Sequence, residues 1–112
     1  MRKGKTRVLE RGIESRFLRH LKELWPTSKT RKMNGYGNKG WPDRLVALPM
    51  TPLFLIEFKR PGGELSAIQK FILSELTALG IRVYVCDDVT QAIIYCEAEY
   101  LRANHKKTFQ AA

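Results

Sequence analysis

Cysteine and histidine are scarce in this chain, with two of each in 112 residues. The four are not clustered, so the sequence contains no zinc-binding pattern and implies no disulfide framework. Cys86 lies in an apolar, strand-like run, and we expect it to be a small core residue. His20 and His105 are isolated, and we expect them at the surface rather than among metal ligands.

Long apolar runs are also missing. The longest, from Val46 to Ile56, is too short to cross a bilayer and contains Pro49 and Pro52. The amino terminus is basic, but no apolar signal-peptide segment follows it. We therefore expect no membrane association and a cytoplasmic location.

Acidic residues are rare in the first part of the chain. Residues 1–44 hold 13 Lys and Arg but 4 Asp and Glu, whereas residues 45–112 hold 7 of each. The whole net charge of +9 therefore lies in the first 44 residues. This asymmetry favours a polyanionic partner, most simply nucleic acid, over a basic face that only aids solubility.

The length and the 44% hydrophobic content suit one globular domain. We place it at residues 9–103, with flexible ends at 1–8 and 104–112. Apolar periodicity predicts helices over about 9–25, 67–79 and 89–103, and strands over 28–33, 44–48, 53–59 and 81–86. This order predicts an α/β fold, in which helices pack on a small mixed sheet and the last strand is reached by a right-handed crossover.

The second predicted helix has a clear apolar pattern and a clear start. Its inward-facing residues are expected to be Ile68, Phe71, Ile72, Leu76 and Leu79. Ser66 and Gln69 form an S-x-x-Q capping box, in which Gln69 reaches back to the helix start.

Two charges interrupt a strand that is otherwise apolar on both faces. Glu57 and Lys59 alternate within Leu53–Lys59, so they share one face. A buried, unpaired carboxylate there costs several kcal/mol or stays protonated. A partner is required, and either Lys59 or a divalent cation can serve.

Asp43 opens the preceding strand and supplies a second carboxylate. If the two strands form a hairpin, pairing residue 43 with 57 or 59 brings both acids to one face. A plain four-residue turn pairs 43 with 58 and separates them. A site for Mg²⁺ or Mn²⁺, which take oxygen ligands, therefore needs an odd-numbered turn or a bulge. The alternative is a structural Glu57–Lys59 pair with Asp43 as a turn residue.

The residues Trp41-Pro42-Asp43 followed by Glu57-Phe58-Lys59 resemble the PD-(D/E)xK nuclease signature. The longer run of Glu57-Phe-Lys59-Arg-Pro-Gly-Gly63-Glu-Leu65-Ser66 and Gln69, after Gly40-Trp-Pro-Asp43-Arg44, is similar to the VRR-NUC family of that superfamily. Glu14 also fits the family pattern. The resemblance runs from about residue 9 to 95 and is closest to the stand-alone form of phages and bacteria.

The resemblance implies a restriction-endonuclease-like fold and DNA cleavage that depends on Mg²⁺ or Mn²⁺. Carried over by position, Asp43 and Glu57 bind the metal directly, the main-chain carbonyl of Phe58 is a further ligand, and Glu14 contacts the metal through water. Lys59 is the catalytic lysine, and Gln69 belongs to the active site as well as to the capping box. Stand-alone members resemble Holliday-junction resolvases that act as homodimers, which suits two symmetric nicks.

Basic and aromatic residues around this motif are candidates for contact with DNA. The glycine-rich loop at residues 34–40 can approach a DNA backbone or stack on an open base, although Trp41 can equally pack on the core. The candidates are Lys29, Arg31, Lys32, Tyr36, Lys39, Trp41, Arg44 and Arg60.

Three functions compatible with these residues remain. The first is a structure-selective endonuclease of a bacterial or phage-infected cell that resolves four-way junctions. The second is a flap or nonspecific nuclease with the same site. The third is a DNA-binding module without catalysis, which Asp43, Glu57 and Lys59 disfavour because a binder gains little from buried acids.

Overall fold

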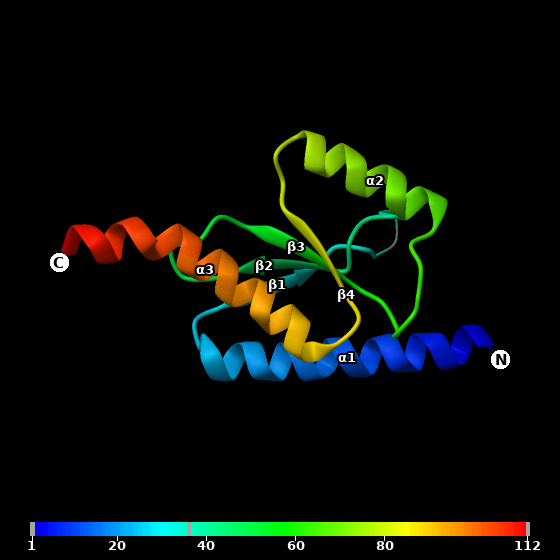
Figure 1. Ribbon diagram of the computed structural model, residues 1–112. Helices are drawn as coiled ribbons and strands as arrows, with labels where there is room; N and C mark the ends of the chain where they lie inside the picture. The colour runs from blue at the N-terminus through cyan, green and yellow to red at the C-terminus, as the bar shows by residue number, and fades with distance from the viewer. Residues whose placement is uncertain (1, 36, 112) are drawn as a thin grey trace.

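The computed structural model describes residues 2–35 and 37–111. The described residues form three helices and one four-stranded sheet (Figure 1). The elements are α1 (Arg2–Leu24), β1 (Lys29–Lys32), β2 (Arg44–Ala47), β3 (Phe54–Phe58), α2 (Ala67–Ala78), β4 (Val83–Cys86) and α3 (Val89–Ala111). The predicted single α/β domain with a mixed sheet is confirmed.

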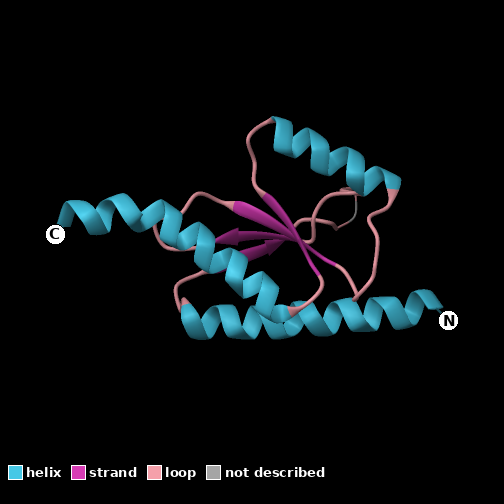
Figure 2. Ribbon diagram, in the orientation of Figure 1, coloured by secondary structure: helices cyan, strands magenta, loops and turns pink. Residues whose placement is uncertain are grey.

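The sheet has the strand order β1-β2-β3-β4 (Figure 2). β1 pairs with β2 and β2 with β3, both antiparallel, whereas β3 and β4 are parallel. Parallel neighbours need a crossover connection, and α2 provides it. β1 and β4 are consequently the two edge strands.

Helices α1 and α3 cover one face of the sheet, and α2 lies on the other side (Figure 1). Alternate residues of β3 therefore enter different environments. Phe54, Ile56 and Phe58 join a core with residues of α1 and α3, and the rings of Phe17 and Phe58 lie 5.3 Å apart. Cys86 and Cys96 are free and buried, as the sequence predicts for Cys86. Glu57 points to the α2 side, away from this core.

Two helices are longer than the apolar pattern predicts. α1 begins at Arg2 rather than near residue 9, and α3 continues to Ala111 rather than ending near residue 103. No proline interrupts either extension, so nothing local ends the helix. The flexibility expected for residues 1–8 and 104–112 stays a prediction. None of the described helices is long and apolar enough to cross a membrane.

The expected burial of α2 is wrong. Leu76 is buried, but Phe71 is 59% exposed, Leu79 is 77% exposed and Ile68 is 40% exposed. α2 packs mainly against β4, at the edge of a narrow sheet. Its apolar face is wider than the surface that this edge offers, so part of that face remains in solvent.

Candidate active site

The turn between β2 and β3 sets the relation of the two predicted carboxylates. The ladder pairs Arg44 with Ile56 and Val46 with Phe54, and continued by one residue it places Asp43 opposite Glu57. The connection is centred on Met50, whose φ is +53°. The turn therefore has an odd number of residues. This is one of the two arrangements, an odd-numbered turn or a bulge, that were expected to bring the acids together. Because opposite residues project to the same side, both acids lie on one face.

Asp43 is held by two hydrogen bonds from different segments. The backbone N–H of Phe58 donates to Asp43 Oδ2 at 2.7 Å, and Asn34 Nδ2 donates to Asp43 Oδ1. The carboxylate is thus tied both to the end of β3 and to the start of the glycine-rich loop. Asn34 is not predicted from the sequence, where its only signal is that it opens this loop.

Glu57 is buried, with 5% of its surface exposed. Its Oε2 accepts a hydrogen bond from Gln69 Nε2 at 3.1 Å and lies 3.5 Å from Lys59 Nζ. Its Oε1 is buried without a hydrogen-bond partner among the described residues. Ser28 Oγ and Asn34 Oδ1 are buried in the same way, but the Glu57 carboxyl lies against that of Asp43, and this second acid makes Oε1 a candidate ligand position.

Gln69 joins the helix start to this site. Its Oε1 accepts from Lys59 Nζ at 2.9 Å and from the Ser66 backbone N–H at 2.8 Å. Ser66 Oγ accepts in return from the Gln69 backbone N–H, which completes the predicted capping box. The Gln69 side chain therefore caps the start of α2 and contacts Glu57 and Lys59 at the same time.

Burial shifts the proton affinities of both acids. It raises the pKa of Glu57 to about 8, and the nearby Asp43 charge raises it as well, whereas Lys59 lowers it. Burial likewise raises the pKa of Asp43 to about 6, against the lowering effect of the Phe58 N–H bond. Two adjacent carboxylates that resist ionisation together are typical of a site that a cation completes.

The donor set suits a hard divalent cation. Two carboxylates meet on one face, and one oxygen, Glu57 Oε1, has no partner among the described residues. Among all the residues that the structure describes, no group of three or more His, Cys, Asp and Glu side chains is arranged to hold a metal. Mg²⁺ nevertheless needs only one or two carboxylates when substrate phosphate and water complete its shell. The residues therefore fit such an ion bound together with a nucleic acid.

Glu14 lies beside the pair but is already engaged. Its Oε2 is 2.6 Å from Arg44 Nε, and its charge helps to raise the pKa of Asp43. Glu10, one helical turn earlier, acts on Asp43 in the same way and was missed by the sequence analysis. A cavity of about 130 Å³ lies here, lined by Glu10, Arg11, Glu14, Lys32, Asn34 and Asp43.

The candidate DNA contacts occupy different environments. Lys29, Arg31 and Lys32 are exposed on edge strand β1, and Lys32 also lines the cavity beside Asp43. Lys39 and Arg60 are exposed, and Trp41 is half-buried. Arg44 is held in its ion pair with Glu14. Tyr36 lies outside the described residues.

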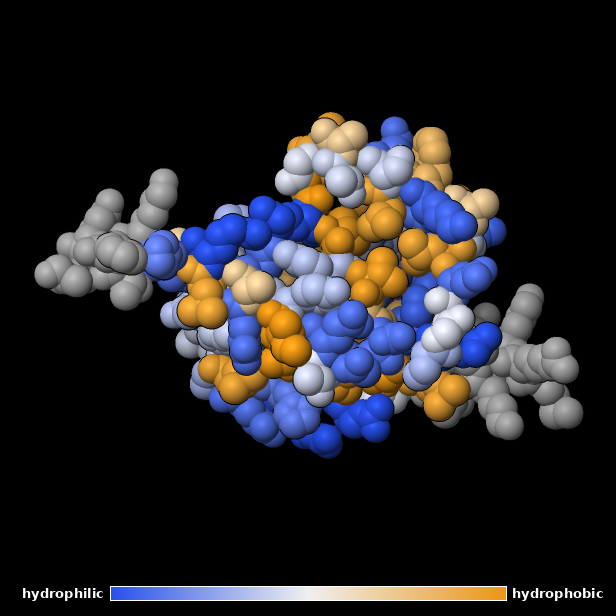
Figure 3. All heavy atoms as spheres, in the orientation of Figure 1, coloured by the Kyte–Doolittle hydropathy of each residue, from blue (hydrophilic) through white to orange (hydrophobic). Residues whose placement is uncertain are grey.

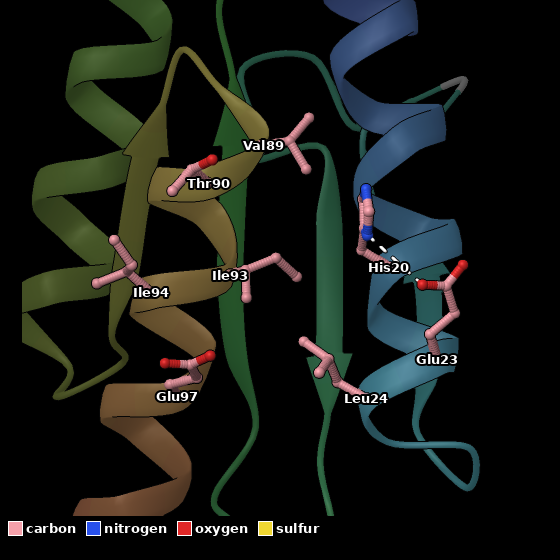
Figure 4. Close-up of a pocket in the computed structure, with 8 residues that line it drawn as sticks. All are labelled: His20, Glu23, Leu24, Val89, Thr90, Ile93, Ile94 and Glu97. Atoms are coloured by element: carbon pink, nitrogen blue, oxygen red, sulfur yellow. Dashed lines mark ion pairs between the residues drawn. The ribbon is translucent and has the colours of Figure 1, made fainter.

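A larger cavity of about 290 Å³ lies between α1 and α3 (Figure 4). It is lined by His20, Glu23 and Leu24 of α1 and by Ile93, Ile94 and Glu97 of α3, and in Figure 4 Ile93 points toward α1 whereas Ile94 points away from it. None of the residues that line it belongs to the Asp43–Glu57 site. Its polar residues are His20, Glu23, Thr90 and Glu97, and it does not bring together two buried carboxylates and an ammonium group as the Asp43–Glu57 site does.

Comparison with known proteins identifies a family and a similar phage protein. The profile of the VRR-NUC domain family matches residues 7–89, a stretch that contains all five predicted catalytic residues. The chain is also similar to a protein of Acyrthosiphon pisum secondary endosymbiont phage 1 named "Putative nuclease p44". The two are 39% identical over 67 residues, which cover 54% of this chain and 72% of the phage protein.

Proposed function

Because the chain belongs to the VRR-NUC domain family and carries a nuclease domain, we propose that it is a divalent-metal-dependent, structure-selective DNA endonuclease. Its proposed substrate is the Holliday junction, and its proposed active form is a homodimer. The cation is Mg²⁺ or Mn²⁺, held by the acids, with water and DNA phosphate completing its shell.

One observation carries the proposal, which is the meeting of two carboxylates and an ammonium group at one end of the sheet. Asp43 stands opposite Glu57 in the ladder, and Lys59 Nζ lies 3.5 Å from Glu57 Oε2. A module that only binds DNA has no use for acids whose burial destabilises the folded chain and whose charge repels phosphate. Metal-assisted hydrolysis of a phosphodiester can use both kinds of group, the acids to hold the cation and the ammonium to offset charge on the phosphate.

Each residue has a distinct proposed role. Asp43, Glu57 and the main-chain carbonyl of Phe58 would hold the cation, with Glu14 reaching it through water. When bound, the cation would lower the pKa of a water and offset charge on the phosphodiester. Lys59 holds the attacking water or the scissile phosphate. Gln69 orients the Lys59 ammonium and the Glu57 carboxylate through one amide group.

The basic surface next to this site supports DNA as the substrate. Edge strand β1 presents Lys29, Arg31 and Lys32 to solvent, and Lys32 reaches the cavity beside Asp43. Phosphate groups that follow this edge would therefore lead a strand to the two carboxylates. Such contacts are electrostatic and independent of base sequence, as a structure-selective enzyme requires.

The proposed activity is tested by incubating the protein with labelled four-way junction, flap and linear duplex DNA of matched sequence. We expect paired nicks in the junction with Mg²⁺ or Mn²⁺ and no product with EDTA. Equal cleavage of all three substrates would instead indicate a nonspecific nuclease, and preference for the flap a flap nuclease. Binding without cleavage under every condition would indicate a DNA-binding module.

Thermal unfolding of the protein alone tests the metal site without reference to activity. Since both acids have pKa values above their unfolded values, the stability they contribute is present below about pH 4 and is lost as pH rises to about 8. In EDTA we therefore expect Tm to fall between pH 6 and 8. Mn²⁺ at one fixed concentration, about 100 times its Kd at pH 8, should raise Tm by about 10 °C at pH 8 and by less at pH 6, where the protonated acids bind the cation more weakly.

The matched control for this measurement is the Asp43→Asn/Glu57→Gln double variant. It should lose both the fall of Tm with pH in this range and the response to Mn²⁺. An equal response to Mn²⁺ in the double variant and the wild type would place the cation elsewhere.

A further inference from the structure

The two edges of the sheet are protected very differently. Strand β1 reads KTRK, so three of its four residues carry positive charge. Strand β4 reads VYVC and carries no charge and no proline. Exposed edges of soluble proteins are normally blocked by lysine, proline or bulges, because a bare edge pairs with other strands. The β4 edge lacks all of these.

The backbone of β4 presents hydrogen-bonding groups on its outer side. The carbonyls of Arg82 and Cys86 accept from the N–H groups of Leu55 and Lys59, so these residues direct their backbone toward β3. Alternate residues of a strand direct their backbone groups to opposite sides. The N–H and C=O groups of Val83 and Val85 therefore point away from β3. In the part of the chain that the structure describes, no strand lies on that side.

Apolar side chains surround this edge. Val85 and Ile81 are each 36% exposed, and Phe71 of α2 is 59% exposed. A groove of about 360 Å³ follows the start of β4, lined by Thr77, Gly80, Ile81, Arg82, Val83 and Tyr84. In Figure 3, apolar surface gathers where α2 and β4 face the viewer. An apolar surface offers no positive charge to bind the phosphates of DNA, so DNA is a poor candidate to cover it.

The charges that flank β4 indicate which partner strand fits. Arg82 precedes the strand, and Asp87 and Asp88 follow it. In an antiparallel pair of two identical strands, the positive start of each meets the negative end of the other. A two-fold axis through Val85 sets Arg82 opposite Asp88, and an axis through Tyr84 makes them diagonal neighbours. Within one protomer Arg82 lies 3.5 Å from Glu99, and Asp88 accepts a hydrogen bond from the Gln91 backbone N–H, so the contacts between strands would add to these contacts. The segment is in this sense complementary to itself.

We infer that the β4 edge is a self-association surface, on which β4 of a second copy pairs antiparallel about a two-fold axis near Val85. The two four-stranded sheets then form one continuous sheet, and the exposed apolar residues of α2, Phe71 among them, lie over the junction. This assignment rests on the homodimer proposed above and specifies how that dimer is built.

The pairing has a direct consequence for catalysis. Glu57 pairs with Val85 in the parallel ladder, so each active site lies one strand away from the new interface. Opposite residues project to one side of a sheet, so both Glu57 carboxylates open onto the same face. Three strand spacings separate them by roughly 14 Å. Two sites on one face, related by a two-fold axis, suit paired cuts in a four-way junction.

Sedimentation of the full chain tests this surface with one variant and one control. Val85→Lys places a charge on the edge strand in the way that natural edges do. Ile94→Lys changes an apolar residue of similar kind, 55% exposed, on the α1–α3 cavity (Figure 4). We expect dimers for the wild type and Ile94→Lys, and 12.9 kDa monomers for Val85→Lys. Circular dichroism confirms that each variant is folded.

The outcomes separate the surface from the dimer itself. Dimers that persist in Val85→Lys, or that are lost in Ile94→Lys, overturn the β4 assignment while the homodimer stands. A wild type that stays monomeric overturns both. If Val85→Lys does not fold, cross-linking of a Val85→Cys variant tests the β4 assignment instead. Diamide should oxidise the new thiols, which lie near the axis, to a covalent dimer, and Ile94→Cys should stay monomeric on a non-reducing gel. Equal cross-linking of both variants would overturn the assignment.

Discussion

Replacing Asp43 by Asn, or Glu57 by Gln, is expected to lower the rate of DNA cleavage by at least about 10³-fold, equivalent to about 4 kcal/mol of transition-state stabilisation. Both replacements keep the size of the side chain but remove the charge that binds the cation. DNA binding should remain within a few-fold of the wild type, because the cations of β1 that are proposed to contact phosphate are unchanged.

The same two variants should be at least as stable as the wild type when metal is absent. Burial raises the pKa of both acids, so ionisation of either one opposes folding. A neutral amide removes that cost and can still take part in hydrogen bonds with Phe58 or Gln69. Lost activity together with an unchanged or higher Tm in EDTA would mark these acids as functional rather than structural.

Glu64→Gln is the matched control for these variants. Glu64 lies in the loop between β3 and α2 and is exposed. Its neutralisation should leave both cleavage rate and Tm unchanged. Wild-type turnover in Asp43→Asn or Glu57→Gln would show that the ligand assignment is wrong.

The second large effect is expected from Lys59→Met, which should lower the cleavage rate at saturating DNA by about 10²- to 10³-fold. The Lys59 side chain is 12% exposed, and its ammonium lies between the Glu57 carboxylate and the Gln69 amide. Methionine fills the same space without a charge or a donor. Lys59→Arg should not restore the rate, because a planar guanidinium does not fit a site built around a compact ammonium group.

Arg60→Met provides the comparison for Lys59→Met. Arg60 is the next residue along the chain, and it is exposed. Its loss should weaken DNA binding modestly and leave the rate at saturating DNA unchanged. Quantitative binding and single-turnover cleavage assays on both variants separate the two effects. If Lys59→Met cleaved at the wild-type rate and only bound DNA more weakly, Lys59 would be one more phosphate contact.

Much of the site could be predicted because its residues depart from the apolar pattern of the sequence around them. Glu57 stands in a strand whose other residues are apolar, and Lys59 directly follows that strand. Burial of a charge is too costly to occur without a partner. The S-x-x-Q pattern at Ser66 and Gln69 predicted the start of α2, and the capping box is present. These signals lie within a few residues of one another, so they are readable in one dimension.

Other features depended on contacts between distant segments. Asn34 was missed because nothing around it in the chain indicates that its amide meets Asp43, nine residues later. The apolar face of α2 was predicted to be buried, and the periodicity that supported this prediction was genuine. Periodicity reports which side of a helix is apolar, but it does not report how much of the sheet lies under that side.

The sequence by itself determined the α/β fold, the strand that carries Glu57 and ends just before Lys59, and the basic character of the first 44 residues, because hydrophobic pattern and charge are local properties. Only the tertiary structure decided that Asp43 stands opposite Glu57, since a one-residue change of register moves a side chain to the other face. The tertiary structure also decided that β1 and β4 are the edge strands and that β4 carries no protecting charge. Strand order and register arise from long-range packing, which no short stretch of sequence encodes.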